Sequence, residues 1–253
     1  HGAVLNNSLS FDASYFVSKM TGGILLARNQ MPSYFYSYYP ESSFVPYINY
    51  NEDKRTGFDA AVNYRKQMGD WFVGAGLNLT YYTTKATKRD DTNYADAYQY
   101  RQGKPLDAIW GYQCLGFFKD EDDIANSPKQ VIGGEIKPGD LKYVDQNNDG
   151  KIDSKDMVNL GKGGWYGAPT TLGLNVTLKY KNRTLFLLGT GTFGGHGVKN
   201  NSYYWARSEG KYSTVMRGRW TPETAATATY PRLTTTDGTN NYQTSSFWIY
   251  STN

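Results

Sequence analysis

The segment 145–156 (DQNNDGKIDSKD) carries oxygen-bearing groups at alternating positions, a pattern that could bind a metal ion. Alternating side chains can turn to one side of a loop, and Gly150 at the sixth position permits the sharp turn between them. Ca²⁺ takes about six or more oxygen ligands, and this ligand number favours Ca²⁺ over Mg²⁺. The predicted ligands are the side chains of Asp145, Asn147, Asp149, Asp153 and Asp156 and the carbonyl of Lys151.

Two features limit what this segment can do. Position 12 is Asp156 rather than the usual glutamate, and a metal-free surface turn rich in Asp, Asn and Gly is the alternative. Pro138 and Gly139 precede the segment, and Gly161 follows shortly after it, so helices are not expected on either side. We therefore expect a structural cation that pins a loop of a β-rich protein, not the opening helix pair of a calcium sensor.

Composition excludes several classes of protein. The chain has 253 residues, 16% aromatic residues and 23 tyrosines, which favours strands and turns over helices. The net charge of +4 is scattered along the chain, so no nucleic-acid partner is predicted. The lone Cys114 excludes an internal disulfide, and no apolar run approaches the roughly 18 residues of a transmembrane helix.

Apolar and polar residues alternate with period two in several segments about ten residues long, the length with which strands cross a bilayer in a barrel. Tight turns join these segments in pairs, whereas the other connections are long, as in outer-membrane barrels. The fold class is therefore all-β, an antiparallel transmembrane β-barrel portion with long extracellular loops. The expected strands are 9–19, 58–66, 71–82, 171–181 and 184–194, and the expected long loops are 83–170 and 195–245.

Two other interpretations remain open at this point. A soluble, calcium-stabilised β-sandwich that binds carbohydrate would share the alternation, the aromatic residues and the cation loop. An enzyme is less favoured, because the chain has two histidines, and Cys114 lies in a strand-like aromatic run without an evident histidine partner.

Longer motifs carry a resemblance to a known family. The segment 136–153 (IKPGDLKYVDQNNDGKID) resembles a recurring block of the SusC/RagA-type TonB-dependent transporters. Further matches follow in the family's order at 219–223 (RWTPE), 229–233 (TYPRL) and 245–248 (SSFW). The resemblance covers most of the chain and is most specific downstream of residue 136.

The resemblance implies a piece of a 22-stranded barrel. Such proteins import a nutrient (a glycan, oligosaccharide or peptide) across the Gram-negative outer membrane of Bacteroidetes-like bacteria. A SusD-like surface lipoprotein covers the extracellular face, and TonB acts through an amino-terminal part. Because neither a plug domain nor a TonB box is recognisable here, we expect the chain to be a fragment.

Aromatic residues in the long loops are the predicted substrate contacts, because such rings can stack on a sugar or a peptide side chain. Packing between loops or against the lipoprotein is the alternative for each of them. The candidates are Trp110, Tyr112, Trp165, Tyr166, Tyr203, Tyr204 and Trp205.

Overall fold

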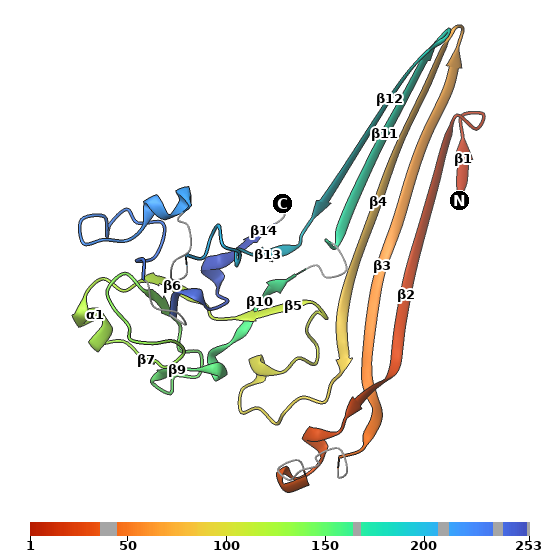
Figure 1. The fold of residues 1–253 in the computed structure, drawn as a ribbon. Coiled ribbons are helices and arrows are strands. Elements are labelled where there is room, and N and C mark those ends of the chain that lie inside the picture. Colours follow the sequence, from red (N-terminus) through yellow and green to blue (C-terminus); the bar gives the residue numbers. More distant parts are fainter. Residues whose placement is uncertain (36–44, 164–167, 207–212, 235–239, 252–253) are drawn as a thin grey trace.

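The computed structural model describes residues 1–35, 45–163, 168–206, 213–234 and 240–251. A long antiparallel sheet runs through it in the order β1-β2-β3-β4-β11-β12, with β1 and β12 as its edges (Figure 1). No helix in these ranges is long and apolar enough to cross a membrane. The strands are β1 (Gly2–Val4), β2 (Leu9–Leu26), β3 (Tyr47–Met68), β4 (Trp71–Lys88), β11 (Thr170–Tyr180) and β12 (Arg183–Phe193).

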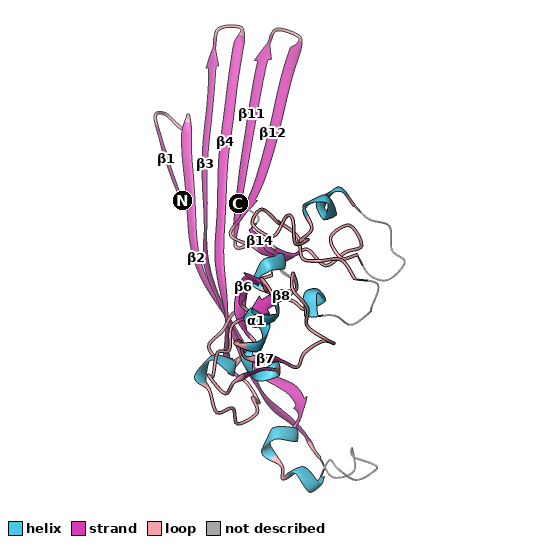
Figure 2. Ribbon diagram, turned by 90° about the vertical axis from the view of Figure 1, so that its left-hand side faces the viewer, coloured by secondary structure: helices cyan, strands magenta, loops and turns pink. Residues whose placement is uncertain are grey.

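The remaining chain folds into a loop assembly at one end of the sheet, while the tight turns lie at the other end (Figure 2). Its strands are β5 (Ala108–Gly111), β6 (Cys114–Phe117), β7 (Lys129–Gln130), β8 (Leu141–Tyr143), β9 (Lys151–Ile152), β10 (Val158–Lys162), β13 (His196–Val198) and β14 (Ile249–Ser251). Its helices are α1 (Glu121–Ala125), η4 (Ala97–Gln99), η5 (Ser154–Asp156), η6 (Thr214–Gly218), η7 (Asn240–Tyr242) and η8 (Ser246–Trp248), and η1 (Arg28–Gln30) and η2 (Ser33–Phe35) follow β2.

One face of the sheet is apolar and uncovered. The register places four apolar residues in one row across four strands, and each side chain alternates with a polar or small neighbour. All members of the row are between 42% and 49% exposed, although their residue types favour burial. The row consists of Phe11, Val62, Leu77 and Leu174.

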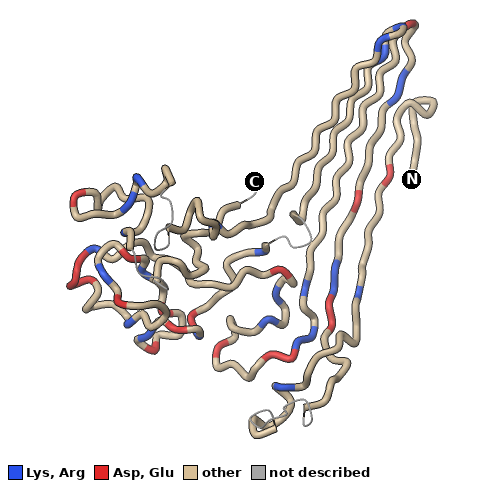
Figure 3. The backbone as a smooth tube through the Cα atoms, in the orientation of Figure 1, with Lys and Arg blue, Asp and Glu red and all other residues tan. Residues whose placement is uncertain are grey.

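The opposite face is mainly polar. Asn63, Gly76 and Asn175 form one of its rows, and Gly76 leaves room for the two asparagine amides, since a Cβ would lie 2.5 Å from the Asn175 amide. The charged residues of the middle sheet, Asp12 and Asp59, also lie on this face. Other charges gather toward the ends of the strands and in the loop assembly (Figure 3). The edge strand β12 is an exception, because it also carries Phe186 and Leu188 on the mainly polar face.

Aromatic rings bound the apolar face at both ends. Trp71 and Tyr180 stack with centroids 4.5 Å apart beside the tight turns. Phe58 and Tyr81 pack with centroids 5.7 Å apart toward the loop assembly. Trp71 and Tyr81 are separated by ten residues of β4, which corresponds to roughly 34 Å along an antiparallel strand.

A strand lies at each of the five expected positions, but three of the strands are longer than predicted, and β2 ends at Leu26 instead of residue 19. Strand β3 begins at Tyr47 instead of residue 58, and β4 continues to Lys88 instead of residue 82. The sequence underestimates both because residues 51–55 are polar or charged on both faces, and the ladder between β3 and β4 nevertheless continues to Glu52 and Lys88. The loop 83–170 therefore begins near residue 89 and contains its own folded elements. Within it, Asp120 is the N-cap of α1, because its carboxylate accepts the Asp123 N–H at 2.7 Å.

The loop assembly has an apolar core built from segments far apart in sequence. Trp248 is 2% exposed, and its ring meets those of Tyr230 and Trp205 edge-on with centroids 5.7 and 6.0 Å away. Short strands add to this core, since β6 pairs with β8 and β7 pairs in parallel with β9. The buried members of the cluster are Tyr112, Leu141, Tyr143, Ile152, Ala206, Met216, Tyr230 and Trp248.

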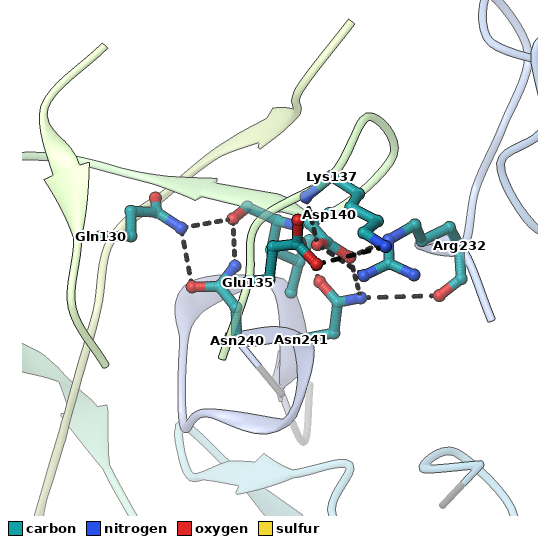
Figure 4. Close-up of polar contacts among 8 residues, drawn as sticks. Gln130, Glu135, Lys137, Asp140, Arg232, Asn240 and Asn241 are labelled. Carbon is teal, nitrogen blue, oxygen red and sulfur yellow. Dashed lines mark hydrogen bonds and ion pairs between the residues drawn. The ribbon is translucent and has the colours of Figure 1, made fainter. Parts of the chain in front are cut away.

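A buried polar network joins η7 to the chain around β8 (Figure 4). Asn241 accepts the Leu141 N–H at 2.8 Å and donates to Asp140 at 2.7 Å. Asp140 also accepts a hydrogen bond from Arg232 Nη2 at 2.9 Å, and Arg232 Nε lies 2.7 Å from the other carboxylate oxygen, so the two side chains form an ion pair. Because these groups lie away from water, each bond is needed to satisfy a buried polar atom.

Removing the buried partner of this ion pair should destabilise the loop assembly. The Asp140 side chain is 2% exposed, so Asp140→Ala leaves the Arg232 guanidinium without its partner, a loss of about 3–5 kcal/mol. The control is Glu135→Ala, because Glu135 is 81% exposed and its pair with Lys137 should contribute at most about 1 kcal/mol. Hydrogen exchange of residues 139–143 and 240–242 measures the loss of stability in each variant, and it should be faster in Asp140→Ala than in Glu135→Ala. Equal exchange rates in the two variants would contradict this role of Asp140.

Candidate functional site

In the first half of the segment 145–156, side-chain oxygens accept hydrogen bonds from backbone N–H groups of the same segment. Asp145 accepts the Gly150 N–H at 2.8 Å, and Asp149 accepts the Lys151 N–H at 2.9 Å. Asn147 accepts the Asp149 N–H at 3.0 Å. Gly150 has a φ of +81°, which only glycine adopts readily, so the predicted reason for glycine at this position is confirmed.

Asp156 has a different environment from the other predicted ligands. It is 1% exposed, and its two oxygens accept the N–H groups of Gln146 and Asp153, each at 2.8 Å. Asp153 in turn caps η5 by accepting the Lys155 N–H at 2.7 Å. Asp156 therefore ties the end of the loop to its beginning.

Of the predicted metal ligands, only those in the first half of the segment are arranged in a way that suits a hard cation. Carboxylate and amide oxygens of Asp145, Asn147 and Asp149 lie on neighbouring turns and are the ligand types that Ca²⁺ prefers. In the described ranges, however, no three acidic, histidine or cysteine side chains lie close enough together to hold a metal ion. The buried Asp156 carboxylate already accepts two backbone N–H groups.

The structure separates the predicted aromatic contacts. Tyr112 is 5% exposed and belongs to the core, where burial raises its pKa to about 12. Tyr204 and Trp205 pack against the same core. Tyr203 is 48% exposed and its hydroxyl lies 3.0 Å from that of Thr214. Trp165 and Tyr166 lie outside the described residues.

Comparison with known proteins gives one relative in sequence and several in structure. No protein-family model matches the chain. TonB-dependent receptor P26 of Formosa agariphila is 32% identical over 127 residues, which are 48% of this chain and 12% of that receptor. The RagAB peptide importer in its open-open state matches 96% of this chain with a TM-score of 0.65 and 17% identity. Its closed-closed state matches 96% with a TM-score of 0.59 and 19% identity.

The resemblance to SusC/RagA-type TonB-dependent transporters is confirmed. The sequence relative is named as a TonB-dependent receptor, and the matched RagAB structures share the fold of this chain. The chain spans 12% of the length of the curated relative and 25% to 26% of the matched chains.

Of the predicted aromatic residues that the structure describes, Trp110 lines open space. With Arg101 it borders a cavity of about 430 Å³ beside the loop end of β4. Both residues also border a neighbouring space of about 100 Å³, together with Tyr94. Sequence reasoning missed Arg101 and Tyr94, because 89–107 has no periodic pattern that would mark its residues as part of a site.

A second cavity of about 490 Å³ adjoins the first, since Arg89 and Arg101 line both. Arg89 forms an ion pair with Asp53 and donates to the carbonyls of Glu52 and Lys88 at 3.2 and 2.9 Å. It thus fixes the end of the β3–β4 ladder at the border of the two cavities.

The predicted cation loop touches the segment that carries these cavities. Tyr98 and Gln99 both donate to the Lys155 carbonyl, at 2.9 and 3.2 Å. Ser154 and Met157 border the small space that Arg101 and Trp110 share. A change in the order of the loop should therefore reach the cavities.

Cys114 does not have the properties of a catalytic nucleophile. Burial raises the pKa of its thiol to about 11, so the group stays protonated at neutral pH. The relatives are described as a receptor and as a peptide transporter or importer.

Proposed function

We propose that the chain forms part of a TonB-dependent importer that carries a nutrient across the Gram-negative outer membrane. The observation that carries this proposal is the uncovered apolar face bounded by aromatic rings. Tilted by about 40°, the roughly 34 Å between Trp71 and Tyr81 spans about 26 Å across a bilayer, close to the apolar band of about 25 Å in outer-membrane barrels. The other face, with Asn63, Asn175 and Asp59, suits a water-filled interior.

The loop assembly is then the extracellular end, because outer-membrane barrels have short turns on the periplasmic side. A SusD-like surface lipoprotein is the proposed partner at this end, and TonB is the proposed source of energy through a part of the protein outside this chain. The substrate is a glycan, oligosaccharide or peptide. Both compared states belong to an importer described as transporting peptides, which favours a peptide.

The soluble β-sandwich is not favoured. A sandwich buries the apolar face of one sheet against a second sheet. In the described residues the apolar face has no second sheet across it, and Leu77 and Leu174 remain 45% and 49% exposed.

Import can be tested with one pair of arginine substitutions on adjacent residues of β4. Leu77→Arg places a charge in the middle of the apolar face and should cost about 2–4 kcal/mol in a bilayer, with loss of the protein from the outer membrane and loss of uptake. Asn78→Arg, on the other face, should leave assembly intact. Outer-membrane fractionation and energy-dependent uptake by cells measure both effects, and unchanged assembly in Leu77→Arg would contradict the proposal.

We also propose that the segment 145–156 binds a structural Ca²⁺. Asp145, Asn147, Asp149 and the Lys151 carbonyl would hold the cation, and Asp153 would move toward them to complete the set, while Asp156 keeps its two backbone bonds. The cation would offset the repulsion between carboxylates and the cost of ordering an exposed loop. The loop already folds around the Asp145 carboxylate, which accepts the backbone N–H groups of Asp149 and Gly150, and this curvature supports the arrangement.

Removal of Ca²⁺ should loosen this loop and the segment that it contacts. With millimolar Ca²⁺, hydrogen exchange of residues 145–156 and 97–101 should slow by about 10- to 100-fold relative to excess chelator. Asp149→Ala should abolish the difference, whereas Asp122→Ala, an exposed acid on α1, should preserve it. Identical exchange with Ca²⁺ and with chelator would overturn the cation site.

A further inference from the structure

The two large cavities beside the loop end of β4 share one arginine whose charge is not matched. Arg101 donates its backbone N–H to Asp91 at 3.1 Å, but its guanidinium makes no hydrogen bond or ion pair with any described residue. It lines both large cavities and the small one next to Trp110. A guanidinium has five N–H donors, so most of its binding capacity is unused here.

The neighbouring charges are already engaged. Arg89 is paired with Asp53. Asp91 also accepts the backbone N–H of Gln102, at 2.9 Å. Asp90 accepts from the Asn29 backbone at 3.4 Å and from the Gln30 amide at 3.2 Å. Arg101 is therefore the group here that is most able to bind an anion.

Rings beside Arg101 are held in place. The Tyr94 ring meets the Tyr100 ring edge-on, with centroids 5.4 Å apart, and the Tyr100 hydroxyl donates to the Tyr94 carbonyl at 3.0 Å. Trp110 lies in β5, whose pairing with β10 places it opposite Asn159. In the cavity of about 430 Å³, Trp110 thus supplies an apolar wall beside the guanidinium of Arg101.

We propose that Arg101 and Trp110 form a subsite for a carboxylate-bearing end of the imported substrate. Arg101 would bind the carboxylate in a bidentate manner, and Trp110 would pack against the apolar part of the same residue. A volume of about 430 Å³ accommodates one or two residues of a short oligomer. This subsite rests on the proposed import function, and it specifies the end group that the importer selects.

The test compares acidic ligands with neutral analogues on the intact receptor in detergent. The probes are the tripeptide Ala-Leu-Ala with a free carboxyl terminus and its carboxyl-terminal amide, and trigalacturonic acid and its methyl ester. Calorimetry should show that the unmodified receptor binds the acid of one pair about 10-fold or more tightly than its neutral analogue. The pair that shows the difference identifies the carboxylate as that of a peptide or of an acidic sugar.

Two variants decide whether Arg101 is responsible. Arg101→Gln should remove the preference for the acid and leave binding of the neutral analogue unchanged. Arg217→Gln is the matched control, because Arg217 is an exposed arginine that lines a different cavity of the loop assembly. An equal loss in both variants would show a general charge effect and would overturn the subsite.

The remaining outcomes separate the subsite from the proposed function. Equal affinity for acid and neutral analogue, a preference that survives Arg101→Gln, or no binding of any probe would each overturn the subsite. Import would still stand if cells expressing the receptor took up a nutrient that cells lacking it did not. Absence of such uptake would instead refute the import function.

Discussion

The structure depends on the pairing of backbone hydrogen bonds in long antiparallel ladders. Strand β3 pairs with β2 on one side and with β4 on the other, and each ladder extends over most of its length. Within a bilayer, unpaired N–H and C=O groups would cost several kcal/mol each, so spanning strands must be satisfied by their neighbours. Because the ladders satisfy the backbone, the side chains on the two faces of the sheet can differ in polarity. The row from Phe11 to Leu174 is accordingly apolar.

In the loop assembly, long ladders are not available to satisfy the backbone N–H and C=O groups. Its strands have two to five residues, too few to satisfy the backbone by ladders alone, so side-chain amides bind backbone groups instead. Gln130 illustrates this, because it donates to the Leu141 carbonyl at 3.0 Å and accepts the Tyr143 N–H at 2.7 Å. Order around the cavities thus rests on a few buried amides and on the core around Trp248.

The sequence predicts the sheet far better than the candidate site. Alternation with period two is local, so the hairpin turns at 67–70 and 181–183 could be placed without knowledge of the rest of the fold. Pairings such as Cys114 with Tyr143, or Gln130 with Ile152, join short segments that carry no such pattern. Tyr112 was expected at a binding surface but lies in the core. The sequence could not distinguish the two positions, because tyrosine occurs both in cores and at binding surfaces. Arg101 matters only through the cavities that the fold forms around it.

A spin-label scan along β4, in the protein reconstituted in lipid, tests directly whether the apolar face of the sheet lies against the bilayer. Labels are placed one at a time at residues 73–80, and their accessibility to oxygen and to a water-soluble nickel complex is measured. We expect a period of two, with oxygen access highest at Val73, Ala75, Leu77 and Leu79 and nickel access highest at Gly74, Gly76, Asn78 and Thr80. A profile without alternation, or one with the opposite phase, would contradict the placement of the apolar face in lipid.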